Sequence, residues 1–286
     1  MRLLCLSMAV TTLALLTFAA RSLANERGDL EKAVCGSIQE RLAFTLWSSA
    51  AGRPDPKAAS RVPNAERVIH KSKDGRALKG YKLRGTSRDG GPKGFLLVAQ
   101  GNATLADQLL GSLSLFSGAG LDVYVFDFRG YGDSEGKRRL KAIVSDYREL
   151  FESISASTSG ERLLYGMSFG GVVLLDVIGS GVTFDRAVID STPSRISNMG
   201  CPQEYDPVAN FPQDGSLFLL IAGGRDKVVP LKNSQELLDL AKARGARTEV
   251  RSDFAHSFMD SDIDIHRARL ELIKSFLMGS GRSEEQ

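Results

Sequence analysis

The chain has 286 residues, of which 42% are hydrophobic and 25% are charged. These values are typical of a globular protein, and the length allows one large α/β domain or two small ones. The chain carries 37 basic and 34 acidic residues, and two of the basic ones, Arg2 and Arg21, lie in the apolar N-terminal segment described next. The remainder is close to neutral, so the overall charge gives no reason to expect nucleic acid or an anionic membrane as a partner.

Residues 1–24 have the pattern of a secretory signal peptide. A short positive start precedes an apolar stretch from Leu3 to Ala20, and Ser22-Leu23-Ala24 is a small-x-small cleavage site. The alternative is an uncleaved N-terminal anchor, because the apolar stretch of about 18 residues approaches the length that spans a bilayer. We expect an exported protein, periplasmic or secreted, with no integral membrane segment after cleavage.

Residues 25–65 are predicted to form an N-terminal helix and a connector. Apolar residues recur at helical spacing between Asp29 and Trp47, which indicates an amphipathic helix that carries Cys35. Three prolines between Arg53 and Pro63 are typical of a connecting segment.

Residues 66–278 are predicted to form an α/β domain. Two alternating segments, 66–70 and 78–83, flank an Asp-Gly turn and indicate an antiparallel pair of strands. From residue 94 onward, strands alternate with helices, which predicts a mostly parallel sheet covered by helices on both faces. The expected strands are 94–99, 120–128, 163–165, 186–189, 216–222 and 247–251, and the expected helices are 105–116, 140–155, 169–178, 231–244 and 262–277.

Two further segments complete the predicted organisation. Residues 192–216 are irregular and are expected to form a short cap, and residues 279–286 a polar tail. Ligand sites in parallel sheets lie beyond the carboxyl ends of the strands. The glycine-rich loops of this chain fall at those ends, which places the expected site there.

The sequence Gly-Met-Ser-Phe-Gly at 166–170 lies between an apolar strand and an apolar helix. In such a sharp turn the central residue adopts a strained backbone, and its side chain stands clear of the sheet. Gly166 and Gly170 lack the β-carbons that would collide there. Ser168 is therefore the candidate nucleophile, and the backbone N–H of Phe169 is a candidate oxyanion donor.

A serine nucleophile needs a general base, and histidine is the usual one. The chain has three histidines. His70 falls on an early strand, and His266 lies within the last helix. His256 alone lies in a loop that follows a strand, so it is the predicted base.

The acid that orients His256 should lie between the serine and the histidine in the chain. Asp226 follows an apolar strand in a Gly-Gly-Arg-Asp turn and is favoured. Asp190, one strand earlier, is the alternative. The loop after the strand 94–99 should provide the second oxyanion donor, for which we select the N–H of Asn102.

Cys35 and Cys201 are the cysteines that remain after removal of a signal peptide. An even number of cysteines in an exported protein favours a disulfide, and two free buried thiols are the alternative. No histidine, cysteine and aspartate cluster has the spacing of metal ligands, so neither a metal nor a cofactor is expected.

Together these motifs resemble the α/β-hydrolase superfamily. The matching segments are 127–134 (Asp-Phe-Arg-Gly-Tyr-Gly-Asp-Ser), 166–170, 223–230 (Gly-Gly-Arg-Asp-Lys-Val-Val-Pro) and 255–257 (Ala-His-Ser). The first of them is similar to a loop of the monoacylglycerol-lipase and serine-aminopeptidase groups. The chain departs from the family at Gln100-Gly101, where relatives often have His-Gly, although a glutamine can still brace the loop by hydrogen bonding.

The resemblance implies an exported serine hydrolase that cleaves a small acyl substrate, as an ester, thioester or amide, through an acyl-enzyme. The alternative is a non-catalytic binding or scaffold protein on the same fold, because a fold does not determine function. The complete set of serine, aspartate and histidine in the expected order favours the enzyme.

Overall fold

The computed structural model of the chain describes residues 24–86 and 91–279. The predicted signal peptide and polar tail lie outside the described residues, except for Ala24 and Gly279. Within the described part of the chain, no helix combines the length and the apolar character needed to cross a bilayer.

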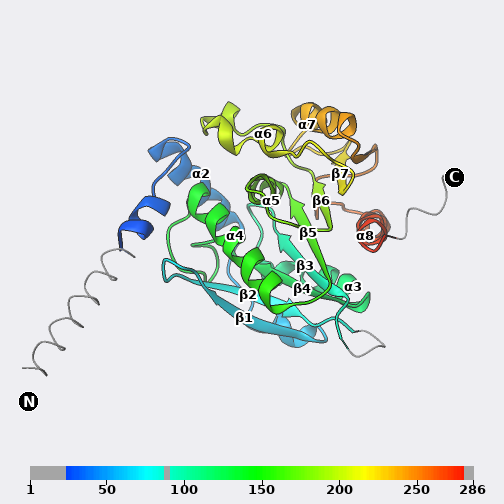
Figure 1. The fold of residues 1–286 in the computed structure, drawn as a ribbon, viewed down its shortest axis with the longest axis horizontal. Helices are drawn as coiled ribbons and strands as arrows, with labels where there is room; N and C mark the ends of the chain where they lie inside the picture. The colour runs from blue at the N-terminus through cyan, green and yellow to red at the C-terminus, as the bar shows by residue number, and fades with distance from the viewer. Residues whose placement is uncertain (1–23, 87–90, 280–286) are drawn as a thin grey trace, which may run out of the picture.

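Eight strands form one sheet in the order β1-β2-β4-β3-β5-β6-β7-β8 (Figure 1). The strands are β1 (Ala65–Lys71), β2 (Ala77–Leu83), β3 (Gly94–Ala99), β4 (Leu121–Phe126), β5 (Glu161–Met167), β6 (Arg186–Asp190), β7 (Phe218–Gly223) and β8 (Arg247–Arg251). Strand β2 is antiparallel to both β1 and β4, and all later neighbours are parallel. The predicted fold class, a mostly parallel sheet with an antiparallel start, is confirmed.

Helices cover both faces of the sheet, as the alternation of elements predicts. The α-helices from residue 37 onward are α2 (Ser37–Ala50), α3 (Leu110–Gly118), α4 (Leu140–Ser157), α5 (Phe169–Gly179), α6 (Pro207–Asn210), α7 (Leu231–Ala243) and α8 (Ile263–Leu277). One hydrophobic cluster gathers residues of α4, α5 and α7, and the other gathers residues of α3 and α8. Strands β3, β4 and β7 are buried along their whole length, which explains why they are apolar without alternation.

The N-terminal helix differs from the prediction. Helix α2 begins at Ser37, so Cys35 lies in the turn before it and not on the helix. Gly36 has φ +77°, which ends any helix that arrives from the N-terminal side. The carboxylate of Glu40 accepts hydrogen bonds from the N–H groups of Val34 and Cys35, at 2.6 and 2.8 Å, and holds this turn in place.

Two contacts fasten α2 and its preceding turn to the rest of the protein. The second oxygen of Glu40 accepts a hydrogen bond from the N–H of Leu140 at 3.0 Å, so a carboxylate lies at the positive end of α4. A disulfide joins Cys35 to Cys201, as predicted, with 3.9 Å between the two α-carbons. The segment 192–216 is thereby linked covalently to the N-terminal region.

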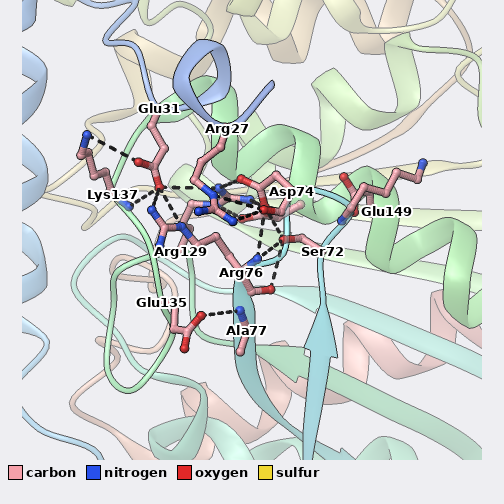
Figure 2. Close-up of polar contacts among 12 residues, drawn as sticks. Arg27, Glu31, Ser72, Asp74, Arg76, Ala77, Arg129, Glu135, Lys137 and Glu149 are labelled. Atoms are coloured by element: carbon pink, nitrogen blue, oxygen red, sulfur yellow. Dashed lines mark hydrogen bonds and ion pairs between the residues drawn. The ribbon is translucent and has the colours of Figure 1, made fainter. Parts of the chain in front are cut away.

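A buried arginine fastens the loop after β4 to the neighbouring turn between β1 and β2 (Figure 2). The guanidinium of Arg129 is fully buried and contacts the carboxylates of Asp74, in the β1–β2 turn, and Asp146, on α4. Burial by itself would raise the pKa of the Asp74 carboxyl, but its bonds with Arg129 and Ser72 hold that pKa below its usual value. Glu31 lies 3.8 Å from the same guanidinium, so the N-terminal segment joins this cluster.

Candidate active site

Ser168 lies between the end of β5 and the start of α5. Its backbone has φ 53° and ψ −117°, a conformation that costs free energy for a residue with a β-carbon. A β-carbon at Gly170 would lie 2.0 Å from the carbonyl oxygen of Ala99, and one at Gly166 would lie 2.7 Å from the α-carbon of Gly171. The two glycines therefore allow the tight turn, for the steric reason inferred from the sequence.

His256 and Asp226 lie together at the carboxyl edge of the sheet. Nδ1 of His256 is 2.7 Å from Oδ2 of Asp226, and both side chains are buried. Oδ1 of Asp226 accepts hydrogen bonds from the N–H groups of Val228 and Val229, at 2.9 and 2.8 Å. This pairing leaves Nε2 as the remaining nitrogen of the imidazole ring.

The Asp226 carboxyl is held in its ionised form. Burial would raise its pKa, but the hydrogen bond with His256 and those from Val229 and Val228 outweigh burial and lower it. A carboxylate in this position can hold one tautomer of the imidazole and stabilise an imidazolium.

Asp190, the alternative acid, has different partners. Its carboxylate, which is fully buried at the end of β6, pairs with Arg269 at 2.8 Å. It also accepts hydrogen bonds from the hydroxyls of Tyr165 at 3.2 Å, Ser257 at 2.9 Å and Ser191 at 3.0 Å. These contacts make it a support for the loop around His256.

The backbone on both sides of His256 belongs to this buried network. The N–H of Ala255 donates to Asp260 at 2.7 Å, and its carbonyl accepts from Arg269 at 2.7 Å. On the other side, the N–H of Ser257 donates to the hydroxyl of Ser191 at 3.1 Å. Arg269 also pairs with Asp260 at 3.0 Å, so one guanidinium holds two buried carboxylates and a carbonyl of the histidine loop.

The N–H groups of Asn102 and Phe169 both belong to residues that line the cavity of Ser168. Among the described residues, neither N–H donates to another group of the protein. A β-carbon placed at Gly101 would lie 3.8 Å from that of Ser168, so this loop passes close to the serine. The hydroxyl of Tyr131 donates to Oδ1 of Asn102 and orients its side chain.

Phe169 connects the candidate oxyanion site to α2, a contact that the sequence did not indicate. The Phe169 ring packs edge-on against Phe44 of α2 and against Phe128, with 5.4 Å between ring centroids in each case. Trp47, one turn after Phe44, also lines the cavity. The periodicity of α2 marks it only as amphipathic. The signal that this helix lies near the site is the predicted bond between Cys35 and Cys201, because Cys201 belongs to the cap.

Gln100 directly follows β3, in the loop that leads to Asn102. It is fully buried, and its Oε1 accepts a hydrogen bond from the hydroxyl of Tyr147 at 3.1 Å. Its Nε2 has no partner among the described residues. Gln100 therefore braces the loop through one of its two polar atoms.

The cavity at Ser168 has a volume of about 450 Å³ and mostly apolar walls. Ser168, His256, Asn102 and Phe169 all line it, so the structure brings these predicted residues together. The apolar wall residues include Trp47, Leu109, Val172, Ile196, Met199 and Phe258. Such a cavity suits a ligand that carries an apolar group.

The other two histidines lie elsewhere. Nε2 of His266 is 3.0 Å from the hydroxyl of Ser112, and burial lowers the pKa of its imidazole. His70 lies on the edge strand β1, where it is half-buried, and burial lowers its pKa as well. Neither residue lines the cavity of Ser168.

Comparisons with known proteins find similar sequences and a similar fold. Residues 90–209 match the family described as serine aminopeptidase, S33. An uncharacterised protein of Mycobacterium tuberculosis (strain H37Rv) is 29% identical over 258 residues, covering 84% of this chain and 88% of that protein. The uncharacterised protein YfhR of Escherichia coli K12 is 28% identical over 266 residues, covering 83% and 89%. The structure of the Pyrococcus furiosus esterase Pf2001 superposes with a TM-score of 0.62 at 18% identity, covering 80% of this chain and 96% of the esterase.

Proposed function

We propose that the chain is a serine hydrolase of the α/β-hydrolase superfamily, which its fold and residues 90–209 resemble, and that it cleaves a small ester, thioester or amide through an acyl-enzyme. One observation carries the proposal. Ser168, in its strained turn, lines the same cavity as His256, whose Nδ1 is bonded to a buried carboxylate.

The proposed reaction has two halves. The Ser168 hydroxyl attacks the acyl carbon while Nε2 of His256 takes its proton, and the carbonyl oxygen becomes an oxyanion. The imidazolium then gives the proton to the leaving group, and the bond to that group breaks. A water molecule repeats the sequence on the acyl-enzyme, which releases the acid and restores the serine.

The other residues of the site stabilise charge. The ionised Asp226 accepts from Nδ1 of His256 and stabilises the imidazolium. The unbonded N–H groups of Phe169 and Asn102 stabilise the oxyanion, with α5 directing its positive end toward Ser168. The apolar walls of the cavity favour an apolar acyl group on the substrate.

The test of this function is reaction with a fluorophosphonate, which labels only an activated serine. We expect labelling of the full chain and of Ser112→Ala, whose serine lies outside the cavity, and none of Ser168→Ala. A folded full chain that stays unlabelled would favour the alternative, a binding or scaffold protein on this fold.

A second experiment determines which class of substrate, ester, thioester or amide, the protein cleaves. The matching family is named for aminopeptidases and the P. furiosus neighbour for an esterase, so a panel should contain p-nitrophenyl esters, thioesters and aminoacyl amides. We expect the highest kcat/KM for esters with apolar acyl chains, because the cavity walls are apolar. A preference for aminoacyl amides would assign a peptidase instead.

We further propose that the protein is exported and that residues 1–24 are removed. The disulfide between Cys35 and Cys201 supports this, because such bonds persist in oxidising compartments. Mass spectrometry of the protein from an exporting host should find Asn25 at its start. An intact Met1 would identify an uncleaved anchor.

A further inference from the structure

We propose that α2 and the basic segment beside it form a docking surface for a bilayer that contains anionic phospholipids. The docking surface consists of Ile38, Leu42 and Leu46 on α2, together with Arg41 and the segment 137–139. Catalysis at Ser168 is not required for this binding.

Three large aliphatic side chains form an exposed stripe on α2. Ile38, Leu42 and Leu46 are 73%, 58% and 69% exposed, and their spacing places them on one side of the helix. Glu40 and Phe44 occupy the opposite, buried side. The stripe is about 12 Å long at the rise of an α-helix. Exposed apolar groups that line up in this way mark an interaction site more often than isolated ones do.

The helix cannot rotate to bury this stripe within the protein. The Cys35–Cys201 disulfide holds the turn before α2, and Glu40 is bonded to the N–H of Leu140. The ring of Phe44 packs on Phe169. With these three attachments in place, the stripe stays directed toward solvent, where a lipid surface can cover it.

Basic side chains gather along one flank of the stripe. Arg41, Lys137, Arg138 and Arg139 line a surface hollow of about 450 Å³, and Glu31 is the one carboxylate in its lining. Glu31 pairs with Arg76 at 2.9 Å and with Lys137 at 3.5 Å. Among the described residues, Arg41, Arg138 and Arg139 have no carboxylate partner, so these three cations are not neutralised. A near-neutral chain therefore carries a local positive patch, which attracts phosphate groups of anionic lipids.

The other flank of α2 adjoins the cavity of Ser168. Trp47 lines that cavity, and so does Met199, which is 56% exposed. A β-carbon at Gly200 would lie 3.3 Å from the side chain of Gln39 on α2, so this part of the 192–216 segment lies against the helix. Docking through α2 would thus bring the cavity mouth close to the lipid surface.

The combination of an apolar stripe and flanking cations favours a bilayer over a protein partner. Helices that lie in the lipid interface have this pattern. Three aliphatic side chains cannot supply the roughly 800 Å² per partner that a stable protein interface buries. A second copy of the chain remains the alternative that the experiment tests.

The native fluorescence of the protein provides the assay. The chain has a single tryptophan, Trp47, and it lies on α2. The full chain is mixed with phosphatidylcholine vesicles that contain phosphatidylglycerol and brominated acyl chains, which quench only nearby indoles. We expect these vesicles to quench Trp47. The quenching should be at least about tenfold weaker with vesicles that lack phosphatidylglycerol. It should also be at least about tenfold weaker in high salt, because screening weakens the attraction. Vesicle binding without quenching of Trp47 would refute the proposal.

Matched variants separate the docking surface from general adhesion. The triple substitution Ile38→Ser/Leu42→Ser/Leu46→Ser should weaken partitioning at least about tenfold. The control Ile69→Ser/Val250→Ser, which removes exposed apolar groups on β1 and β8, should change it little. Equal partitioning of both variants would overturn the proposal. Leu42→Ser alone serves if the triple variant does not fold.

Two further measurements complete the design. Lys137→Gln/Arg139→Gln should reduce the preference for anionic vesicles, while Lys232→Gln/Lys242→Gln on α7 should not. Hydrolysis of a soluble ester should be unchanged in the triple variant, and Ser168→Ala should still dock, so failure of docking and failure of the proposed activity are distinguishable. If the chain forms a dimer that the triple substitution dissociates, and partitioning to vesicles is unchanged, the stripe binds a second copy of the chain. That result would overturn the proposal.

Discussion

The substitution Arg269→Met tests whether the buried network behind His256 positions the proposed catalytic base. Methionine keeps much of the length of arginine but removes its charge. The change leaves the fully buried carboxylates of Asp190 and Asp260 without their cation and the carbonyl of Ala255 without its donor. It should therefore affect both stability and turnover.

The size of the effect follows from the contacts. Removing one partner of a buried ion pair costs about 3–5 kcal/mol, because an uncompensated charge remains. For a chain of this size, each kcal/mol lowers the melting temperature by about 2–4 °C, so a decrease of about 6–20 °C is expected. At 25 °C the folded variant should have a kcat at least about tenfold lower with little change in KM, because the backbone on both sides of His256 loses its fixed position.

Thermal denaturation and steady-state kinetics with a soluble ester measure these effects, and Arg267→Met is the matched control. Arg267 pairs with Asp264 on the surface of the same helix, with both side chains largely exposed, so its loss should change stability by less than about 0.5 kcal/mol. A destabilisation by Arg269→Met below about 1 kcal/mol would refute the structural argument. A lower melting temperature with an unchanged kcat at 25 °C would refute the positioning of His256.

Three other predictions concern separate parts of the molecule. Asp226→Asn should lower kcat by about 10⁴-fold, far more than Asp190→Asn does, and the reverse order would transfer the role of the acid to Asp190. Burial raises the pKa of Asp127 to about 7, so the folded state holds its proton more tightly than the unfolded state does. Stability should therefore fall as the pH rises from about 4 to about 7, and Asp127→Asn should flatten that dependence. The same change of melting temperature with pH in both proteins, from about pH 4 to about 8, would contradict this. Cys35→Ser opens a loop with a sequence separation of 166 residues and should cost about 4–5 kcal/mol in the chain-entropy model, with Ser168 still reactive to fluorophosphonate; two free thiols in the unreduced, denatured mature protein would show that no disulfide exists.

The parts of the structure that depend on local sequence could be predicted. The apolar strands β3 and β7 are uniform because both faces of the sheet are covered, and this uniformity is visible in the sequence. The turn at Ser168 could be predicted from Gly166 and Gly170, which lie within five residues of sequence. Asp226 and His256 could be selected because each follows a strand, and parallel strands end at one edge.

Contacts between distant segments could not be predicted in the same way. The periodicity of α2 indicates an amphipathic helix, but Glu40 and Phe44 determine which side is buried, and each of them has a partner about 100 residues away or more. The helix also begins later than its pattern suggests, because Gly36 interrupts it. Arg269 gives no local signal, since an arginine on an amphipathic helix ordinarily faces solvent.

The attachment of α2 has a consequence for the order in which the molecule is assembled. The helix is synthesised early, but the groups that fasten it belong to Leu140, Phe169 and Cys201, which follow much later. None of these attachments can form until the chain has grown past them. Helix α2 is therefore made early and docked late. A chain interrupted before Cys201 contains the turn at Ser168 but has no disulfide bond to hold the helix that packs against it.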